Sequence, residues 1–318
     1  MILPENVFFE FGGGGANASL RPAVSYAYTV CVVSDGVRKH GPSAAFFSDL
    51  ENRCTNLRRL HLSNADINSP LPASVEVLTL SQCSLSPLGF PPSRFDAASQ
   101  TVTSPRLRKL ELLSVELQRG ALAAVPASVE KLRIKNTGVS HESLEGVTYA
   151  AVPQLAEIDL SDSTTLTDIE LYHIISAWPS ITTLKMNGCV NTTFPQISVF
   201  TQIFENLNRA GRLEVFEAAG VPFMPSSMTW VCSYLYSLRR LSIVGCPLNK
   251  QSVARIVTDL PYLQSLDVSG CQQLNDAFFL VFAGLRDTLR FLNVWSTNIA
   301  DHTVHMLRLS MPHCEIVH

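Results

Sequence analysis

The residues in this sequence that could do chemistry are few and lie far apart. His61 could act as a general base, and Glu157 and Asp159 could act as a carboxylate pair, because alternate residues of a strand share one side. No identifiable nucleophile lies beside His61, and no histidine stands at metal-ligand spacing from the two carboxylates. The glycines at 12–15 are not followed by the Gly-Lys-Ser/Thr of a phosphate-binding loop. We therefore predict no catalytic residues, no metal, no cofactor and no small-molecule substrate.

The cysteines are scattered without a C-x-x-C pair, which argues against both zinc and a disulfide framework. The sequence has eight of them: Cys31, Cys54, Cys83, Cys189, Cys232, Cys246, Cys271 and Cys314. Four fall on the same position of a sequence repeat, namely Cys83, Cys189, Cys246 and Cys271. This regularity predicts buried thiols in a reducing compartment.

A hydrophobic repeat organises the chain. LRRLSIVGC, from Leu238, and LQSLDVSGC, from Leu263, are separated by 25 residues and share the pattern L-x-x-L-x-L/I/V-x-G-C. The leucines of such a strand point into a core, and the residues between them point to solvent. Ten strand units are predicted, beginning at Leu57, Val75, Leu107, Val129, Leu155, Ile181, Leu213, Leu238, Leu263 and Leu289. Their spacing averages about 26 residues, within the range of this repeat class.

The Gly-Cys units at 186–189, 244–246 and 268–271 resemble the cysteine-containing subfamily of leucine-rich-repeat proteins. The chain is also similar to the ribonuclease-inhibitor type, although its repeat lengths are less regular. The resemblance implies an α/β fold, a leucine-rich-repeat solenoid shaped like a horseshoe. Its parallel β-sheet would line the concave side, with helices or 3-10 segments on the outside.

The repeats divide the chain into two predicted parts. Residues 1–50 are interpreted as an N-terminal cap or degenerate repeat, with a strand around Val30 and Val32 and a helix over 42–52. Residues 51–318 form the repeat domain, with about ten to eleven repeats. Outer helices are predicted over 166–177, 196–210, 229–237, 251–260, 276–285 and 301–310.

Two segments depart from the repeat. The stretch 86–106 has four prolines and is predicted to be an irregular surface excursion. Residues 311–318 align with the beginning of an eleventh strand, whose open edge is a candidate contact surface.

The concave face is predicted from the third, fifth and seventh residue of each unit. Its partner-binding candidates are Arg59, His61, Lys109, Lys131, Arg133, Lys135, Glu157, Asp159, Lys185, Glu217, Arg240, Phe291, Asn293 and Trp295. The first units are basic, and the middle units are acidic to mixed. Phe291 and Trp295 either contact a partner or pack beneath the C-terminal segment as part of a cap.

The net charge and the N-terminal sequence limit which partners and which cellular compartments are expected. The formal net charge of −3 gives no overall attraction to nucleic acid or anionic membranes. RNA remains the weaker candidate partner, because no aromatic residues suited to base stacking are interleaved with the basic strand residues. Neither a signal peptide nor an apolar run of 18 residues is present, so we expect no membrane partner and an intracellular, cytoplasmic or cytoskeletal protein, an organelle being a further option.

These observations favour a non-catalytic protein-interaction scaffold in a larger assembly, axonemal, cytoskeletal or ribonucleoprotein. Proteins similar to this chain include such subunits. They also include substrate-recognition subunits of cullin-type ubiquitin ligases, which are the alternative. Those receptors carry a helical F-box before the repeats, and residues 1–50, rich in glycine and β-formers, do not resemble one.

Overall fold

The computed structural model describes residues 6–11, 29–34, 42–91, 94–96, 101–103, 105–148, 152–192, 213–223 and 225–318. Two compact units divide the chain, Met1–Ala156 and Glu157–His318. The helix expected over 196–210 and the glycines at 12–15 lie outside the described residues. The predicted boundary near residue 50 stays a prediction.

Parallel strands form the main sheet of the first unit, in the order β1-β2-β3-β5-β9-β11. These strands are β1 (Asn6–Phe11), β2 (Thr29–Ser34), β3 (Arg59–Ser63), β5 (Val77–Ser81), β9 (Lys109–Leu113) and β11 (Lys131–Lys135). Within β3, Leu60 and Leu62 are buried, whereas the residues between and beside them are at least partly exposed. This alternation confirms the strand register predicted from the leucine spacing.

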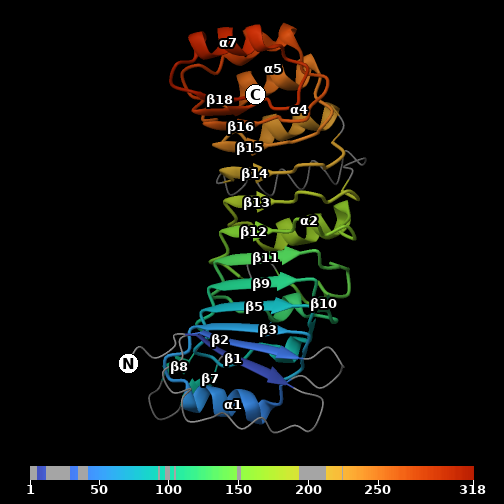
Figure 1. The fold of residues 1–318 in the computed structure, drawn as a ribbon. Helices are drawn as coiled ribbons and strands as arrows, with labels where there is room; N and C mark the ends of the chain where they lie inside the picture. The colour runs from blue at the N-terminus through green and yellow to red at the C-terminus, as the bar shows by residue number, and fades with distance from the viewer. Residues whose placement is uncertain are drawn as a thin grey trace, which may run out of the picture. The chain divides into compact units, whose positions relative to one another are not determined.

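The second unit carries the same kind of sheet, with consecutive parallel strands that lie side by side in Figure 1. They are β12 (Glu157–Asp159), β13 (Thr183–Lys185), β14 (Val215–Glu217), β15 (Arg240–Ser242), β16 (Ser265–Asp267), β17 (Phe291–Asn293) and β18 (Glu315–Val317). In register, Leu241, Leu266, Leu292 and Ile316 fall opposite one another and are buried. The leucine column therefore continues through the predicted eleventh strand.

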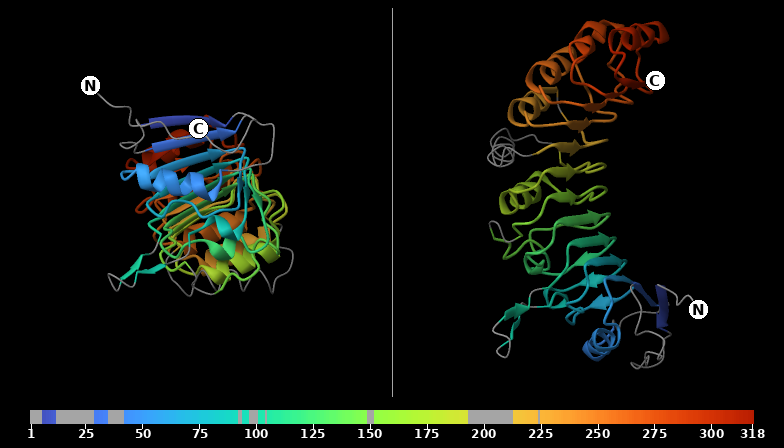
Figure 2. Two further views of the ribbon diagram at one scale, coloured as in Figure 1. Left: turned by 90° about the horizontal axis from the view of Figure 1, so that it is seen from below. Right: turned by 90° about the vertical axis from the view of Figure 1, so that its left-hand side faces the viewer.

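The segments that return from each strand differ between the units. In the first unit they are mainly short pieces: β4 (Asp66–Ile67), β6 (Ser84–Leu85), β10 (Glu116–Leu117), η2 (Pro87–Gly89) and η3 (Leu122–Ala124). In the second they are mainly helices: α2 (Asp168–Ala177), α4 (Pro225–Tyr234), α5 (Lys250–Asp259), η4 (Asp276–Phe278), α6 (Phe279–Ala283) and α7 (Asp301–Ser310). Figure 2 shows α2, α4 and α5 on one side of their strands. Helices at the predicted places are confirmed, apart from the undescribed one.

Helix starts follow the expected capping chemistry. The Asn249 side chain accepts a hydrogen bond from the backbone N–H of Ser252, at 2.8 Å, at the start of α5. In α2, Thr167 and Glu170 form a capping box, which satisfies amide groups that the first helical turn leaves unpaired. Helix α1 (Ala44–Arg53) begins after Ser43, whose hydroxyl accepts from Phe46, and it confirms the helix expected over 42–52.

A left-handed turn follows the strand in all ten repeats. The residues with positive φ there are Asn64, Gln82, Ser114, Asn136, Asp162, Gly188, Gly220, Gly245, Gly270 and Ser296. In nine of these turns the residue that follows is buried, and in the tenth Thr297, after Ser296, is partly buried. The four repeat cysteines occupy that buried position, and each thiol donates to a carbonyl of the preceding repeat; Cys271 Sγ, for example, lies 3.3 Å from the Ile243 oxygen. Thr137 takes the same position and makes the same contact with Leu112.

Two parts of the first unit differ from expectation. The stretch 86–106 contains an antiparallel hairpin, β7 (Arg94–Asp96) paired with β8 (Thr101–Thr103), rather than only irregular chain. Figure 2 shows this hairpin projecting from its unit. Strand β1 was not predicted either, although β2 confirms the strand expected around Val30 and Val32.

Candidate functional site

One face of each sheet presents the side chains that alternate with the buried leucines. We call these the first exposed face, carried by β2 to β11, and the second exposed face, carried by β12 to β18. In the first, Lys131 lies beside Lys109, and Arg133 lies beside Glu111. Thirteen of the fourteen predicted partner-binding residues lie in the strands of these faces, on the side that the sequence assigned, and Trp295 lies in the turn that follows β17. Their role in binding stays a prediction.

Glu111, on β9, holds its neighbours on the first exposed face in place. Its carboxylate accepts a hydrogen bond from Thr79 on β5 at 2.9 Å and forms ion pairs with Lys109 at 2.9 Å and Arg133 at 3.0 Å. Its side chain is only 14% exposed. Burial raises the pKa of Glu111, but the hydrogen bonds and the two cations outweigh this, so the net pKa is lowered. The carboxylate therefore stays charged at neutral pH.

The first exposed face is positive overall. It carries five cations and one carboxylate, Glu111, which gives a formal charge of +4 with His61 neutral. The cations are Arg59, Lys109, Lys131, Arg133 and Lys135. The sequence predicted the basic character but treated Lys109 and Arg133 as independent binding residues, whereas Glu111 ties both together. His61 contacts the Ser63 hydroxyl at 2.9 Å.

The second exposed face has the opposite sign. Two cations, Lys185 and Arg240, face five carboxylates, which gives a formal charge of −3. The carboxylates are Glu157, Asp159, Glu217, Asp267 and Glu315. Lys185 and Glu217 form an ion pair at 3.2 Å between β13 and β14. The acidic to mixed character predicted for the middle units is therefore seen in this face.

Some predicted binding residues on the second face also shape the backbone. Asp159 accepts a hydrogen bond from the backbone of Ser161, Asp267 from Ser269, and Asn293 from Trp295, each two residues ahead. This contact stabilises the turn at the end of the strand. Asp159 is only 4% exposed, so it is much less accessible than the alternating pattern suggested, because its side chain folds over its own turn.

Trp295, in the turn that follows β17, is the largest exposed apolar side chain beside the second exposed face. Trp295 is 62% exposed. Its backbone is fixed by two hydrogen bonds: its N–H donates to the Asn293 side chain, and its carbonyl oxygen accepts from the Gly270 N–H at 2.8 Å. Phe291, the first residue of β17, is half-buried. The C-terminal strand β18 pairs with β17 but leaves Trp295 accessible.

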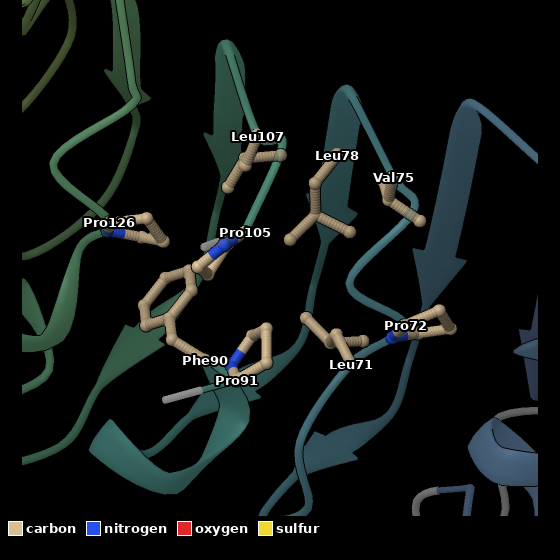
Figure 3. A pocket seen from close by; sticks show the side chains of 9 residues that line it. All are labelled: Leu71, Pro72, Val75, Leu78, Phe90, Pro91, Pro105, Leu107 and Pro126. Carbon is tan, nitrogen blue, oxygen red and sulfur yellow. The ribbon is translucent and has the colours of Figure 1, made fainter. Parts of the chain in front are cut away.

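An apolar pocket in the first unit offers no reacting groups. It is lined by Leu71, Pro72, Val75, Leu78, Phe90, Pro91, Pro105, Leu107 and Pro126, whose side chains face one another in Figure 3. Pro91 precedes β7 and Pro105 follows β8, so the base of the hairpin forms part of the wall. Because none of these side chains titrates, the pocket cannot support acid–base chemistry.

Burial makes three of the cysteine thiols poor nucleophiles. Burial raises the pKa of Cys189, Cys232 and Cys246 to about 12, and all eight cysteines are free. A thiol of this kind remains protonated and is a poor nucleophile. Within the described ranges, no group of three His, Cys, Asp or Glu side chains could hold a metal ion, and no helix is long and apolar enough to cross a bilayer.

No family model matches the chain. Among solved structures, it is similar to an internalin from Listeria monocytogenes, with a TM-score of 0.51 and 16% sequence identity. The match covers 93% of this chain and 76% of the internalin chain. Together with the strand register and the repeated turn, this likeness establishes that the chain has the leucine-rich-repeat solenoid fold.

Proposed function

We propose that this protein is a non-catalytic scaffold that binds other proteins through its two exposed sheet faces, as a subunit of a larger assembly. The exposure of Trp295, at 62%, is the observation that carries this proposal. An exposed tryptophan at the edge of a sheet face is the type of residue that dominates protein interfaces, where truncation costs about 2 kcal/mol or more.

The surroundings of Trp295 support this role. Its backbone is held on both sides, so the ring lies on a fixed support and loses little conformational freedom on binding. Phe291 adds apolar area on β17, the strand before this turn, and Asp267 supplies a neighbouring carboxylate that accepts a hydrogen bond from Asn293, at 3.3 Å. An aromatic anchor with a polar rim is a common arrangement in protein interfaces.

The compartment and the subfamily are further parts of the proposal. Free, buried cysteines that repeat at one turn position support membership of the cysteine-containing subfamily and residence in a reducing, intracellular compartment. Within it we propose a cytoskeletal, axonemal or ribonucleoprotein assembly. The substrate-recognition subunit of a cullin-type ligase remains the alternative, which recovery of a cullin adaptor with the chain would favour.

The proposal is tested by affinity purification of tagged wild-type chain and Trp295→Ala from the cells that make it, followed by mass spectrometry. Tyr262→Ala is the matched control, because Tyr262 is 57% exposed but lies in the turn before β16, off the sheet face. We expect Trp295→Ala to lose a defined set of partners and Tyr262→Ala to keep it. If wild type and Trp295→Ala recover identical partners in equal amounts, the second face is not the docking surface.

A further inference from the structure

The proposed function does not say which kind of partner the basic first exposed face would bind. We propose that this face binds an extended, acidic segment of a partner protein, an inference that rests on the scaffold function proposed above. The observation behind it is the arrangement of five cations on neighbouring strands, two of which, Lys109 and Arg133, form ion pairs with Glu111.

The cations form two lines that meet at Lys131. One line crosses the strands through Arg59, Lys109 and Lys131, because Arg59 pairs with Val77, Val77 with Lys109, and Lys109 with Lys131. Neighbouring strands lie about 4.8 Å apart, so this line is about 14 Å long. The other line follows β11 through Lys131, Arg133 and Lys135.

The spacing along β11 matches an extended peptide. Alternate residues of a strand lie about 6.6 Å apart, which separates Lys131 from Arg133 and Arg133 from Lys135. An extended segment with acidic residues at every second position repeats at the same distance. Each of its carboxylates could therefore lie near one cation without distortion of either backbone.

Glu111 prepares the face for an anionic ligand without neutralising it. By pairing with both Lys109 and Arg133, it holds these long side chains over the sheet and reduces the entropy that they would lose on binding. With five cations and one carboxylate in strands β2 to β11, the formal charge of this face is +4. A positive surface of this size also accelerates the approach of an acidic partner at low salt.

A protein segment fits this face better than RNA does. Strands β2 to β11 present no Phe, Tyr or Trp on the exposed face, so bases would find no stacking platform there. Several residues between the cations are small or aliphatic, namely Val77, Thr79 and Leu113. They offer van der Waals contact to a peptide backbone.

The test is a fluorescence-anisotropy titration of the purified full chain with a labelled peptide of alternating glutamate and serine. A lysine–serine peptide and a single-stranded RNA of similar length are titrated alongside it. The altered chain is Lys131→Glu/Lys135→Glu, which brings the formal charge of the face from +4 to zero. Its matched control, Arg53→Glu/Arg119→Glu, changes the total charge equally at two exposed sites off the face.

We expect the acidic peptide to bind wild type and the control within about twofold of each other, and to bind the face variant at least about tenfold more weakly. Binding should weaken as salt rises. Equal peptide affinity for all three proteins, or preferential binding of the RNA, would overturn the proposal. So would a monomer–dimer equilibrium that the face variant abolishes, because the occupant would then be a second copy. These outcomes do not depend on Trp295, on which the scaffold proposal stands or falls.

Discussion

The guanidinium of Arg133 and the carboxylate of Glu111 lie 3.0 Å apart on neighbouring strands, β11 and β9. They are separated by 22 residues in the chain, one repeat, so the repeat itself brings them together. The same carboxylate accepts from Thr79 on β5. Three consecutive repeats are therefore linked across the first exposed face by one side chain that has only 14% of its surface exposed.

This network predicts an acid-dependent contribution of Glu111 to stability. The pKa of Glu111 is lowered in the folded chain. Its contribution to stability is therefore present at pH above the ordinary glutamate pKa and is lost as the pH falls through the lowered pKa of the folded state. We expect Glu111→Gln to reduce the loss of stability on acidification between pH ~5 and ~3, relative to wild type. Urea unfolding midpoints measured over this pH range, with Glu130→Gln as control, test the expectation. Parallel pH profiles for wild type and Glu111→Gln would contradict it.

The repeated left-handed turn gives a second prediction, about backbone conformation. Gly245 has φ of +70°, and a Cβ there would meet nothing within 4 Å, so Gly245→Ala adds backbone strain without a clash. We expect it to lower the free energy of unfolding by about 1–2 kcal/mol. Chemical denaturation with unchanged m-value measures this.

The reverse substitution is the matched partner of that experiment. Gln82 takes the equivalent turn position with φ of +53°, and its side chain is exposed. Gln82→Gly removes the strain of the left-handed conformation but increases the conformational entropy of the unfolded chain. We therefore expect the free energy of unfolding to rise by between zero and about 1 kcal/mol. If Gly245→Ala were neutral and Gln82→Gly clearly destabilising, the turn would not require the left-handed conformation.

The sequence predicted the strands, their register and their exposed side because leucines at fixed spacing report burial directly. Asn136 or Ser296 at a left-handed turn could be inferred only by aligning them with the glycines of other repeats, since neither residue type requires positive φ. The hairpin β7–β8 was missed because three-residue strands are too short to show a period.

The candidate site was only partly predictable. Which side chains face outward follows from alternation, but which of them pair depends on contacts between strands 22 and 32 residues apart, as for Glu111 with Arg133 and with Thr79. Asp159 was assigned to the exposed face without any signal that its carboxylate would bond to its own turn. The alternation of apolar and polar residues predicts which side of the strand a side chain lies on, but it does not predict the hydrogen bonds of that side chain.

The buried thiols give a third prediction. Burial raises the pKa of Cys189, Cys232 and Cys246 from an ordinary value of 9.0 to about 12, so the thiolate is disfavoured in the folded chain. We expect an alkylating reagent at pH ~8 to leave these three unmodified in native protein and to label them after denaturation. Mass spectrometry of peptides from both samples gives the readout. Rapid native labelling of Cys246 would contradict burial of the repeat turn.

Alkaline pH should act on the same groups. A thiol whose pKa is higher in the folded state than in the unfolded state stabilises the folded chain when the pH is below the unfolded-state pKa. This contribution is lost as the pH rises from about 9 toward 12. We therefore expect the thermal midpoint of wild type to fall over this range. Cys246→Thr, which copies the residue found at Thr137, should show a shallower fall while keeping a donor for the Val221 oxygen, now 3.3 Å from the thiol. Identical profiles for the two proteins would exclude the thiol as a cause.

The last prediction separates the binding role of Trp295 from the structural role of Leu292 in β17. Leu292 is fully buried and Trp295, three residues later, is 62% exposed. We expect Leu292→Ala to lower the free energy of unfolding by about 2–5 kcal/mol, because it leaves a cavity between repeats. Trp295→Ala should change stability by about 0.5 kcal/mol or less. Equilibrium denaturation of both variants checks this. A large loss of stability in Trp295→Ala would mean that the indole packs within its own unit, and partner loss in that variant would then reflect unfolding rather than a missing contact.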